Sequence, residues 1–305
     1  MKTVFNLSLK KSATSYFHNL LRFNNFPCAP EKEYYVFPRD TTGFLSLSKY
    51  VKDELSKSTT VYFSANEHVD LSGEDRKFLN LLVDMEDLHK DLVALLRKKQ
   101  FFNAFECSID RFINLRNNYS SREKFFVSDP NFLYDLLSFL NVMQDSEKEK
   151  SIALIRNQDW EFVTIAREPV DTAISLMKQY IKDRSGASGA IEINKELILF
   201  VRDKSQLFRF LNYFTSIVKK KLEIVEQKFM TGKPEKFLMH IGSEFNVPCP
   251  DVPKTDLKNP NPGLKISSDV EGKLREIFGE LLKDEVEAYK KFSTKFKNKI
   301  NDQAH

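Results

Sequence analysis

An apolar run that leads into a basic turn and then into a helix constrains the fold of this chain more than any other stretch. The run Val4–Leu9 predicts a buried strand. The turn Lys10–Ser15 reads KKSATS and combines positive charge with several hydroxyl groups. In residues 16–21 the apolar side chains recur at helical spacing, which predicts a helix. A strand that leads directly into a helix is typical of the α/β class.

The start of a helix that directly follows a strand is suited to hold an anion. Its first backbone N–H groups have no partner inside the helix, and the helix dipole places partial positive charge there. The hydroxyl groups of Ser12, Thr14 and Ser15 add donors, and Lys11 adds a full charge. We interpret the turn as a cradle for phosphate or sulfate; a basic turn that simply faces water is the alternative. It is not a Walker A loop, because it lacks both glycines of G-x-x-x-x-G-K-[ST].

Composition excludes several classes of protein. The 305 residues are 41% hydrophobic and include 27 phenylalanines, enough for a sizeable core. The net charge of +4 is too small to indicate a nucleic acid as the main partner. Cys28, Cys107 and Cys249 are too widely spaced to predict a zinc site or a disulfide framework, and this usage fits a reducing compartment. We therefore expect a cytoplasmic protein with no membrane span and no signal peptide, and we leave its oligomeric state open.

The rest of the chain alternates short strands with helices, which predicts a mainly parallel sheet. Besides the first strand, strands are expected at 31–37, 59–63, 125–127, 162–166 and 222–225. Besides the first helix, helices are expected at 44–55, 74–99, 101–118, 132–143, 207–218, 234–246 and 269–300, and one starts at residue 170. Irregular chain is expected at the charged stretch 144–150, at the glycine-bearing stretch 185–189 and at the proline-rich crossing 247–268.

A second stretch with anion-binding character follows the strand at 162–166. Arg167 comes at the end of that strand, and Ser175 lies about two turns into the next helix. A buried arginine at such a place needs a partner, and a phosphate is its natural bidentate one. An internal salt bridge with Glu168 or Asp171 is the alternative.

Four stretches, taken in order, carry a resemblance to one family. Residues 10–15 (KKSATS) are similar to the motif P-K-[SA]-G-T-[TS], although Lys10 replaces proline and Ala13 replaces glycine. Residues 32–37 (KEYYVF) are similar to K-E-P-x-[FY]-F, and residues 129–133 (DPNFL) to [ST]-P-x-Y-L. Residues 167–175 (REPVDTAIS) are similar to R-[ND]-P-x-[DE]-x-A-x-S, in which Arg, Pro, Ala and Ser all fall in register. The chain thus resembles, over nearly its whole length, sulfotransferases that use 3′-phosphoadenosine-5′-phosphosulfate (PAPS), especially the bacterial and heparan-type carbohydrate branch.

The resemblance implies a single α/β domain over residues 1–305, with three layers and a central, mainly parallel sheet. It implies PAPS as the sulfuryl donor, its desulfated product PAP, no metal, and a hydroxyl-bearing acceptor, expected to be a glycan. The residues that it places around the 5′-phosphosulfate are Lys11, Ser12, Ala13, Thr14 and Ser15. It places Arg167 and Ser175 on the 3′-phosphate, with Lys258 and Lys265, beside the late Asn/Pro/Gly loop, as further contacts.

The same resemblance points to catalytic roles. Lys11 would neutralise charge that develops on the leaving phosphate. The acceptor hydroxyl needs a general base, for which Glu33 is the first candidate and His68 the second. Alternatively, His68 is an ordinary surface histidine without a catalytic role.

Two other classes of protein stay open. A P-loop kinase or another nucleotide phosphotransferase would also use Lys11 and Ser12, although it usually has intact glycines and a strand that ends in aspartate for magnesium. A non-catalytic relative that binds glycans or assembles with partners is favoured by Ala13 and by the altered turn at Asp129.

Overall fold

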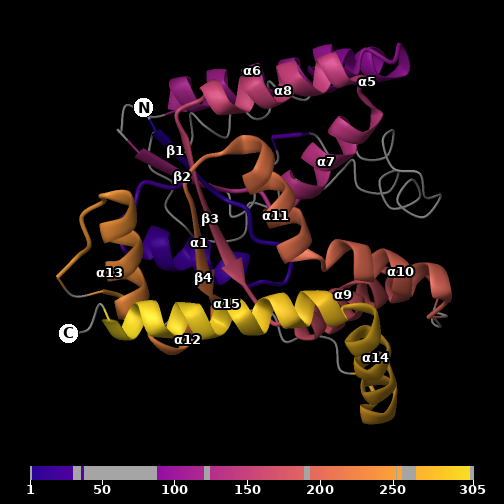
Figure 1. The fold of residues 1–305 in the computed structure, drawn as a ribbon, viewed down its shortest axis with the longest axis vertical. Helices are drawn as coiled ribbons and strands as arrows, with labels where there is room; N and C mark the ends of the chain where they lie inside the picture. The colour runs from indigo at the N-terminus through magenta and orange to yellow at the C-terminus, as the bar shows by residue number, and fades with distance from the viewer. Residues whose placement is uncertain are drawn as a thin grey trace.

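The computed structural model describes residues 2–29, 36–37, 88–119, 124–188, 193–251, 253–255 and 266–302. Within these ranges the chain forms a parallel sheet with helices on both faces (Figure 1). The strand order is β2-β1-β3-β4, and the strands are β1 (Lys2–Asn6), β2 (Lys124–Ser128), β3 (Trp160–Ala166) and β4 (Leu222–Glu226). The predicted α/β class and the central position of the first strand are both confirmed.

The register of the sheet places the carboxyl ends of its strands on one edge. Asn6, the last residue of β1, pairs with Ser128, the last residue of β2. On its other side Asn6 pairs with Val163, and β3 continues until Ala166 pairs with Glu226 at the end of β4. In open parallel sheets ligands bind at this carboxyl edge, so the segments that follow β1 and β3 come together where a site is expected.

Each face of the sheet is covered by its own helices. On one face Phe5 of β1 stacks with Phe112 and Phe132, at ring distances of 4.9 and 5.4 Å. The helices packed there are α6 (Phe101–Tyr119), α7 (Phe132–Val142), α8 (Asp145–Asn157) and α11 (Leu207–Val218), with α5 (Leu88–Arg97) beside α6. On the other face lie α1 (Thr14–Phe23), α12 (Gln227–Gly232) and α13 (Pro234–Phe245), and Phe17 of α1 meets Phe237 of α13 at 5.9 Å.

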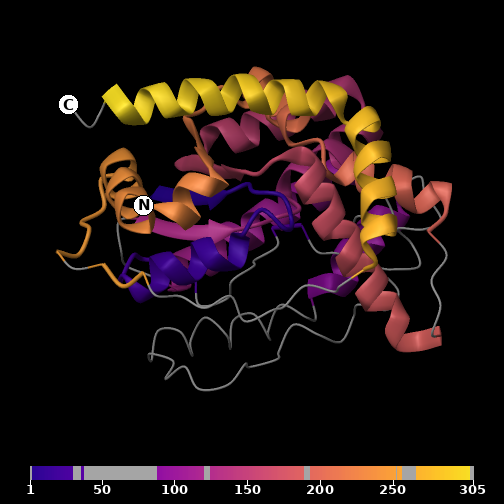
Figure 2. The same ribbon diagram turned by 90° about the horizontal axis from the view of Figure 1, so that it is seen from below.

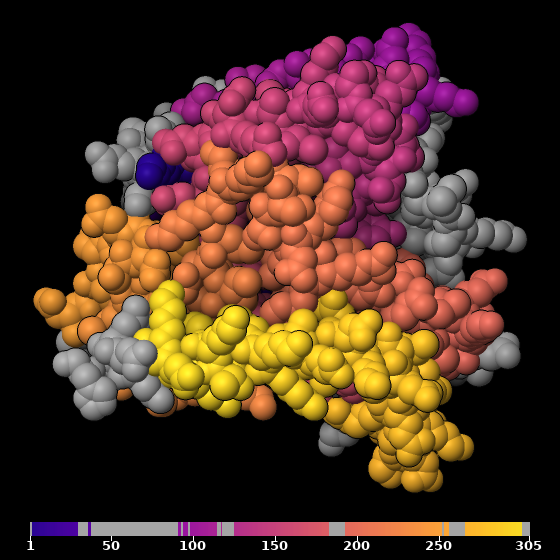
Figure 3. Space-filling view, in the orientation of Figure 1, coloured from indigo at the N-terminus to yellow at the C-terminus, as the bar shows by residue number. Residues whose placement is uncertain are grey.

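A third group of helices extends from the carboxyl edge of the sheet. It consists of α9 (Pro169–Ser188), α10 (Lys195–Lys204) and α14 (Ser268–Leu281), which share a small apolar core. The last helix, α15 (Lys283–Asp302), packs against α11, α9 and β4 and lies across one side of the molecule, as Figures 1 and 2 show; its side chains form a band across the surface in Figure 3. No helix in the described ranges is long and apolar enough to cross a membrane.

Three expectations about local structure were wrong. The stretch 144–150 is not irregular chain, because a capping box between Gln144 and Glu147 starts α8 there and Ile155 anchors the helix in the core. Residues 185–188 continue α9. The closing segment 269–300 is two helices, which meet at the buried Leu282 because α14 packs on α9 while α15 turns away to pack against α11 and β4 as well.

Other elements were missed or lie outside the described ranges. Neither α10 nor α12 was expected from the sequence. Of the helix expected at 74–99, the described part is α5; the elements expected at 44–55 and 59–63 lie outside the described residues. Of the strand expected at 31–37, only residues 36–37 are described, and they form a bend.

Candidate functional site

A chain of buried polar groups holds the segment that leaves β1. Asn6 donates its amide N–H to Ser128 Oγ at 3.1 Å and accepts the backbone N–H of Ser8 at 3.1 Å. The hydroxyl of Ser8 donates to the same Asn6 oxygen and accepts the backbone N–H of Ile165 at 2.6 Å. These bonds join β2, β1 and β3 at the point where the chain enters the turn, so the position of the turn is set by three strands.

The turn itself has an unusual backbone. Lys11 and Ala13 both adopt positive φ angles, 69° and 63°, in the left-handed region that L-residues rarely occupy. Ser12 is buried between them and donates its N–H to Leu9 O at 3.1 Å. Residues held in such conformations cluster at ligand sites, because the surrounding structure must stabilise them. Ala13 has the conformation that glycine adopts most easily, which is the residue of the motif that the turn resembles.

The first turn of α1 has a composition that suits an anion. Its N-cap is Ala13, which has no side-chain oxygen, and its first turn contains no acidic residue. The first N–H groups of a helix need an acceptor, and the helix dipole favours a negative one. The backbone and the charge at this end of α1 therefore suit a phosphate or sulfate group.

Arg167 connects the basic turn after β1 to the segment that follows β3. Its guanidinium donates to the backbone oxygen of Lys11 at 2.7 Å. Burial lowers the pKa of Arg167 from its usual value, and the nearby carboxylates of Asp171 and Glu168 oppose this effect. The ammonium group of Lys11 reaches across to Gln179 of α9, with Nζ to Oε1 at 2.6 Å. Lys11 and Arg167, 156 positions apart in the sequence, are thus direct neighbours.

The alternative partners of Arg167, the carboxylates of Glu168 and Asp171, both have other hydrogen-bond or ion-pair partners. Glu168 caps α9 by accepting the backbone N–H of Asp171 at 2.7 Å. Asp171 pairs with Arg275 of α14 at 2.9 Å. Both acids therefore serve helix ends and helix packing, and the donor of Arg167 goes to the turn instead.

Ser175 is half-buried on α9, one helical turn before Gln179. Positions four apart lie on the same face of a helix. Gln179 contacts Lys11, so Ser175 lies on the face of α9 that is turned toward the basic turn. A salt bridge of 2.6 Å between Lys178 and Glu271 braces α9 against α14.

The expected acceptor side is only partly within the described ranges. Glu33, His68, Lys258 and Lys265 all lie outside the described residues. The buried carboxylate of Asp129, at the end of β2, accepts the backbone N–H groups of Asn131 at 3.0 Å and of Val36 at 2.8 Å.

Asn24 ties the beginning of the late crossing segment to the end of α1. Its side chain accepts the backbone N–H of Lys254 at 2.7 Å and donates to the backbone oxygen of Lys254 at 3.0 Å.

The sequence reasoning missed three residues of this site: Asn6, Ser8 and Gln179. Asn6 and Ser8 lie where an apolar strand ends. A polar residue at the carboxyl end of a buried strand can indicate a site residue, because sites in parallel sheets form at that edge. Gln179 lies four residues after Ser175, so the helical period could have indicated it.

One prediction follows from the left-handed conformation of Ala13. Ala13→Gly should raise the free energy of unfolding by about 0.5–1 kcal/mol, because glycine adopts this conformation without steric cost. The measurement is urea denaturation. Ala153, exposed within α8, is the matched control: Ala153→Gly should lower stability by a similar amount. Loss of stability in both variants would contradict the strain at Ala13.

Comparisons with known proteins agree with this geometry at the level of the fold. No family model matches the sequence, and no curated protein does either. Among solved structures, the chain is similar to a sulfotransferase from Alicyclobacillus acidocaldarius, with a TM-score of 0.50 and 13% identity. The alignment covers 95% of each of the two chains. At this identity the likeness concerns the fold alone: the chain has a sulfotransferase-like α/β fold with the basic turn at the carboxyl edge of its sheet.

Proposed function

We propose that this protein is a PAPS-dependent sulfotransferase that transfers the sulfuryl group of PAPS to a hydroxyl acceptor, with a glycan as the acceptor class. One observation carries the proposal: Arg167, which follows β3, donates directly to the backbone of Lys11 in the turn that follows β1. A donor that carries phosphate groups on both its 3′ and 5′ positions needs two adjoining anion sites. Lys11 and Arg167 belong to two different sequence motifs, and their contact supports two such sites side by side.

The residues around the turn fit such a donor in charge and in hydrogen-bonding type. Lys11 and Arg167 bring two positive charges to a helix start without acidic residues. We assign the 5′-phosphosulfate to the turn Lys11–Ser15, whose backbone N–H and hydroxyl groups are donors. We assign the 3′-phosphate to Arg167 and Ser175, and give Lys258 and Lys265 a supporting role there.

Sulfuryl transfer resembles phosphoryl transfer, in which the protein acts mainly by positioning and by stabilising charge. The donor supplies a sulfuryl group together with a phosphate that leaves. In the proposal Lys11 lies beside that leaving phosphate and neutralises its developing charge. The ammonium group suits this role because it is a point charge on a flexible side chain. Gln179, which accepts from Lys11 Nζ at 2.6 Å, would orient the ammonium before the donor binds. Glu33 would accept the proton of the acceptor hydroxyl, with His68 as the second candidate for this role.

Calorimetric titration with PAP and with AMP tests the donor assignment. The protein should bind PAP at least tenfold more tightly than AMP, because an arginine–phosphate hydrogen bond contributes roughly 1.5–3 kcal/mol. Arg167→Ala should reduce this preference to nearly none. Arg202→Ala, on α10, removes the same charge from a residue paired with Asp203 and should leave the preference unchanged.

Arg167 also shapes the turn, so its two roles must be separated. If Arg167→Ala weakened PAP and AMP equally, the residue would act only on the turn, and the 3′-phosphate assignment would be wrong. Equal binding of PAP and AMP by the unmodified protein would contradict the donor itself. Tighter binding of ATP than of PAP in the same titration would favour the nucleotide phosphotransferase class.

A further inference from the structure

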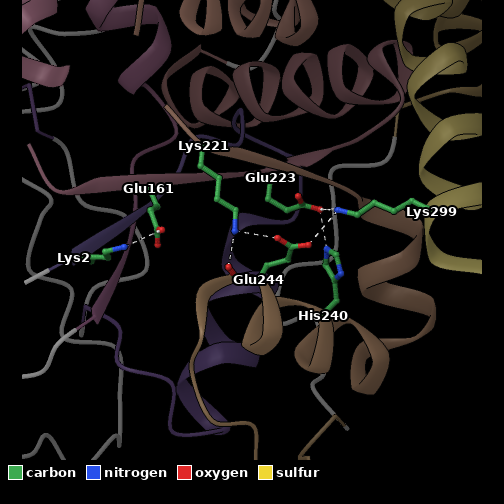
Figure 4. Close-up of polar contacts among 7 residues, drawn as sticks. All are labelled: Lys2, Glu161, Lys221, Glu223, His240, Glu244 and Lys299. Carbon is green, nitrogen blue, oxygen red and sulfur yellow. Dashed lines mark hydrogen bonds and ion pairs between the residues drawn. The ribbon is translucent and has the colours of Figure 1, made fainter. Parts of the chain in front are cut away.

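A second cluster of ionisable side chains lies outside the basic turn, between β4, α13 and α15 (Figure 4). Glu223 is the second residue of β4, and His240 and Glu244 lie four apart on α13. Their ligand atoms all lie within 4.8 Å of one another. Glu223 and His240 are only 9% and 8% exposed, so this is a built interior site and not a patch of surface acids.

The cluster already holds a cation. Lys299 of α15 brings its ammonium group to 2.9 Å from Glu223 Oε1 and 3.3 Å from Glu244 Oε1. His240 Nε2 lies 2.9 Å from the same Glu223 oxygen. Lys221 occupies the other side of Glu244, with Nζ 3.1 Å from Oε2. Two carboxylate oxygens thus meet at the Lys299 ammonium, and the imidazole nitrogen lies beside one of them, with all three ligand atoms within 4.8 Å of one another.

We propose that Glu223, His240 and Glu244 form a zinc site, in which a Zn²⁺ ion takes the place of the Lys299 ammonium group. Imidazole and carboxylate are ligands that zinc accepts, at bond lengths of about 2.0–2.2 Å. Tetrahedral bonds of this length separate ligand atoms by about 3.4 Å, so atoms within 4.8 Å need only a small adjustment. Water completes the four-coordinate shell, as in sites with three protein ligands.

The exchange is feasible for the groups involved. The side chain of Lys299 is 42% exposed, so its ammonium group can swing into water when the metal enters. The proton on His240 Nε2 passes to Nδ1 or to water, which frees Nε2 as a ligand. Lys221 keeps its bond to Oε2 of Glu244 and holds that carboxylate in place as an outer partner.

The charges of the cluster show what a metal would have to replace. The carboxylates of Glu223 and Glu244 are balanced by the ammonium groups of Lys221 and Lys299. Removal of the Lys299 charge leaves a buried carboxylate without full compensation, a state that a divalent cation stabilises. Lys299 is therefore a competitor of the metal and not a part of its shell.

The test is a titration of the tag-free, metal-free protein with Zn²⁺ by calorimetry and with Co²⁺ by absorption. The unmodified protein should bind one Zn²⁺. Lys299→Met should bind Zn²⁺ roughly tenfold more tightly, which corresponds to the removal of about 1.4 kcal/mol of competition. His240→Gln should weaken binding at least roughly a hundredfold, because it removes a ligand. Lys297→Met, which removes an exposed charge two residues from Lys299, is the matched control and should bind like the unmodified protein.

The outcomes separate the zinc site from a merely structural ion network. Absence of binding in both the unmodified protein and Lys299→Met would overturn the proposal, as would unchanged affinity in His240→Gln. Equal affinity of Lys299→Met and Lys297→Met would show that Lys299 does not compete. A thiolate-to-cobalt charge-transfer band would place the metal on Cys28, Cys107 or Cys249, and would also overturn it. Circular dichroism of each variant verifies that it is folded.

Discussion

Lys11→Met should lower the turnover of sulfate transfer by about a hundredfold to a thousandfold. The ammonium group of Lys11 is the flexible point charge of the basic turn, and methionine keeps the length of the side chain without the charge. Affinity for the donor should fall much less than turnover, because the lost interaction strengthens as the leaving phosphate gains charge. The assay is transfer of labelled sulfate from PAPS to a panel of glycans and small alcohols.

Lys10→Met is the control for this experiment. It removes the same charge from the neighbouring position of the same turn, and its turnover should stay within a few-fold of the unmodified protein. Full turnover in Lys11→Met would contradict a catalytic role of Lys11. Equal loss in both variants would mean that Lys11 acts only through the summed positive charge of the turn.

Glu33→Gln should lower turnover by roughly a hundredfold or more, with donor affinity nearly unchanged. Glutamine keeps the shape and the hydrogen bonding of glutamate but cannot accept a proton. The same transfer assay measures turnover, and calorimetry with PAP measures donor affinity. Glu31→Gln changes a carboxylate two positions away and should have little effect.

His68 is the alternative general base, and the same assay distinguishes it from Glu33. Full turnover in Glu33→Gln, together with loss of turnover in His68→Ala, would assign the base to His68. If the unmodified protein sulfated no acceptor in the panel while still binding PAP, a non-catalytic glycan-binding or assembly protein would be favoured.

Local patterns in the sequence predicted the framework of this fold well. The apolar pair Val4 and Phe5 in β1, the apolar run of β3 and the helical period of α11 indicate their elements directly, since burial on one or two faces imposes these patterns on the chain. The basic turn and the Arg167 stretch were recognised because each follows such a strand. Their adjacency was predictable, because parallel strands bring their carboxyl ends to one edge.

Local patterns did not predict the start of α8 or the boundary between α14 and α15. Charged and polar residues dominate the sequence of α8, and only Ser151 and Ile155 are buried, so the helical period of its apolar residues is weak. The break at Leu282 lies within a continuous helical pattern. It is set by two packing surfaces, α9 and the edge of the sheet, that no local window contains.

The sequence by itself determined the main strands, which turn is basic and which strands are followed by basic and hydroxyl-bearing residues, because these properties depend on residues close together in the chain. Only the tertiary structure decided the contacts across the site. Lys11 and Gln179 lie 168 positions apart, and their bond depends on how α9 packs beside the turn. The left-handed backbone at Ala13 likewise needs the support of neighbouring strands, and Lys299 meets Glu223 only because α15 packs against β4. Such contacts depend on the relative placement of whole elements, which is decided by the packing of the complete core.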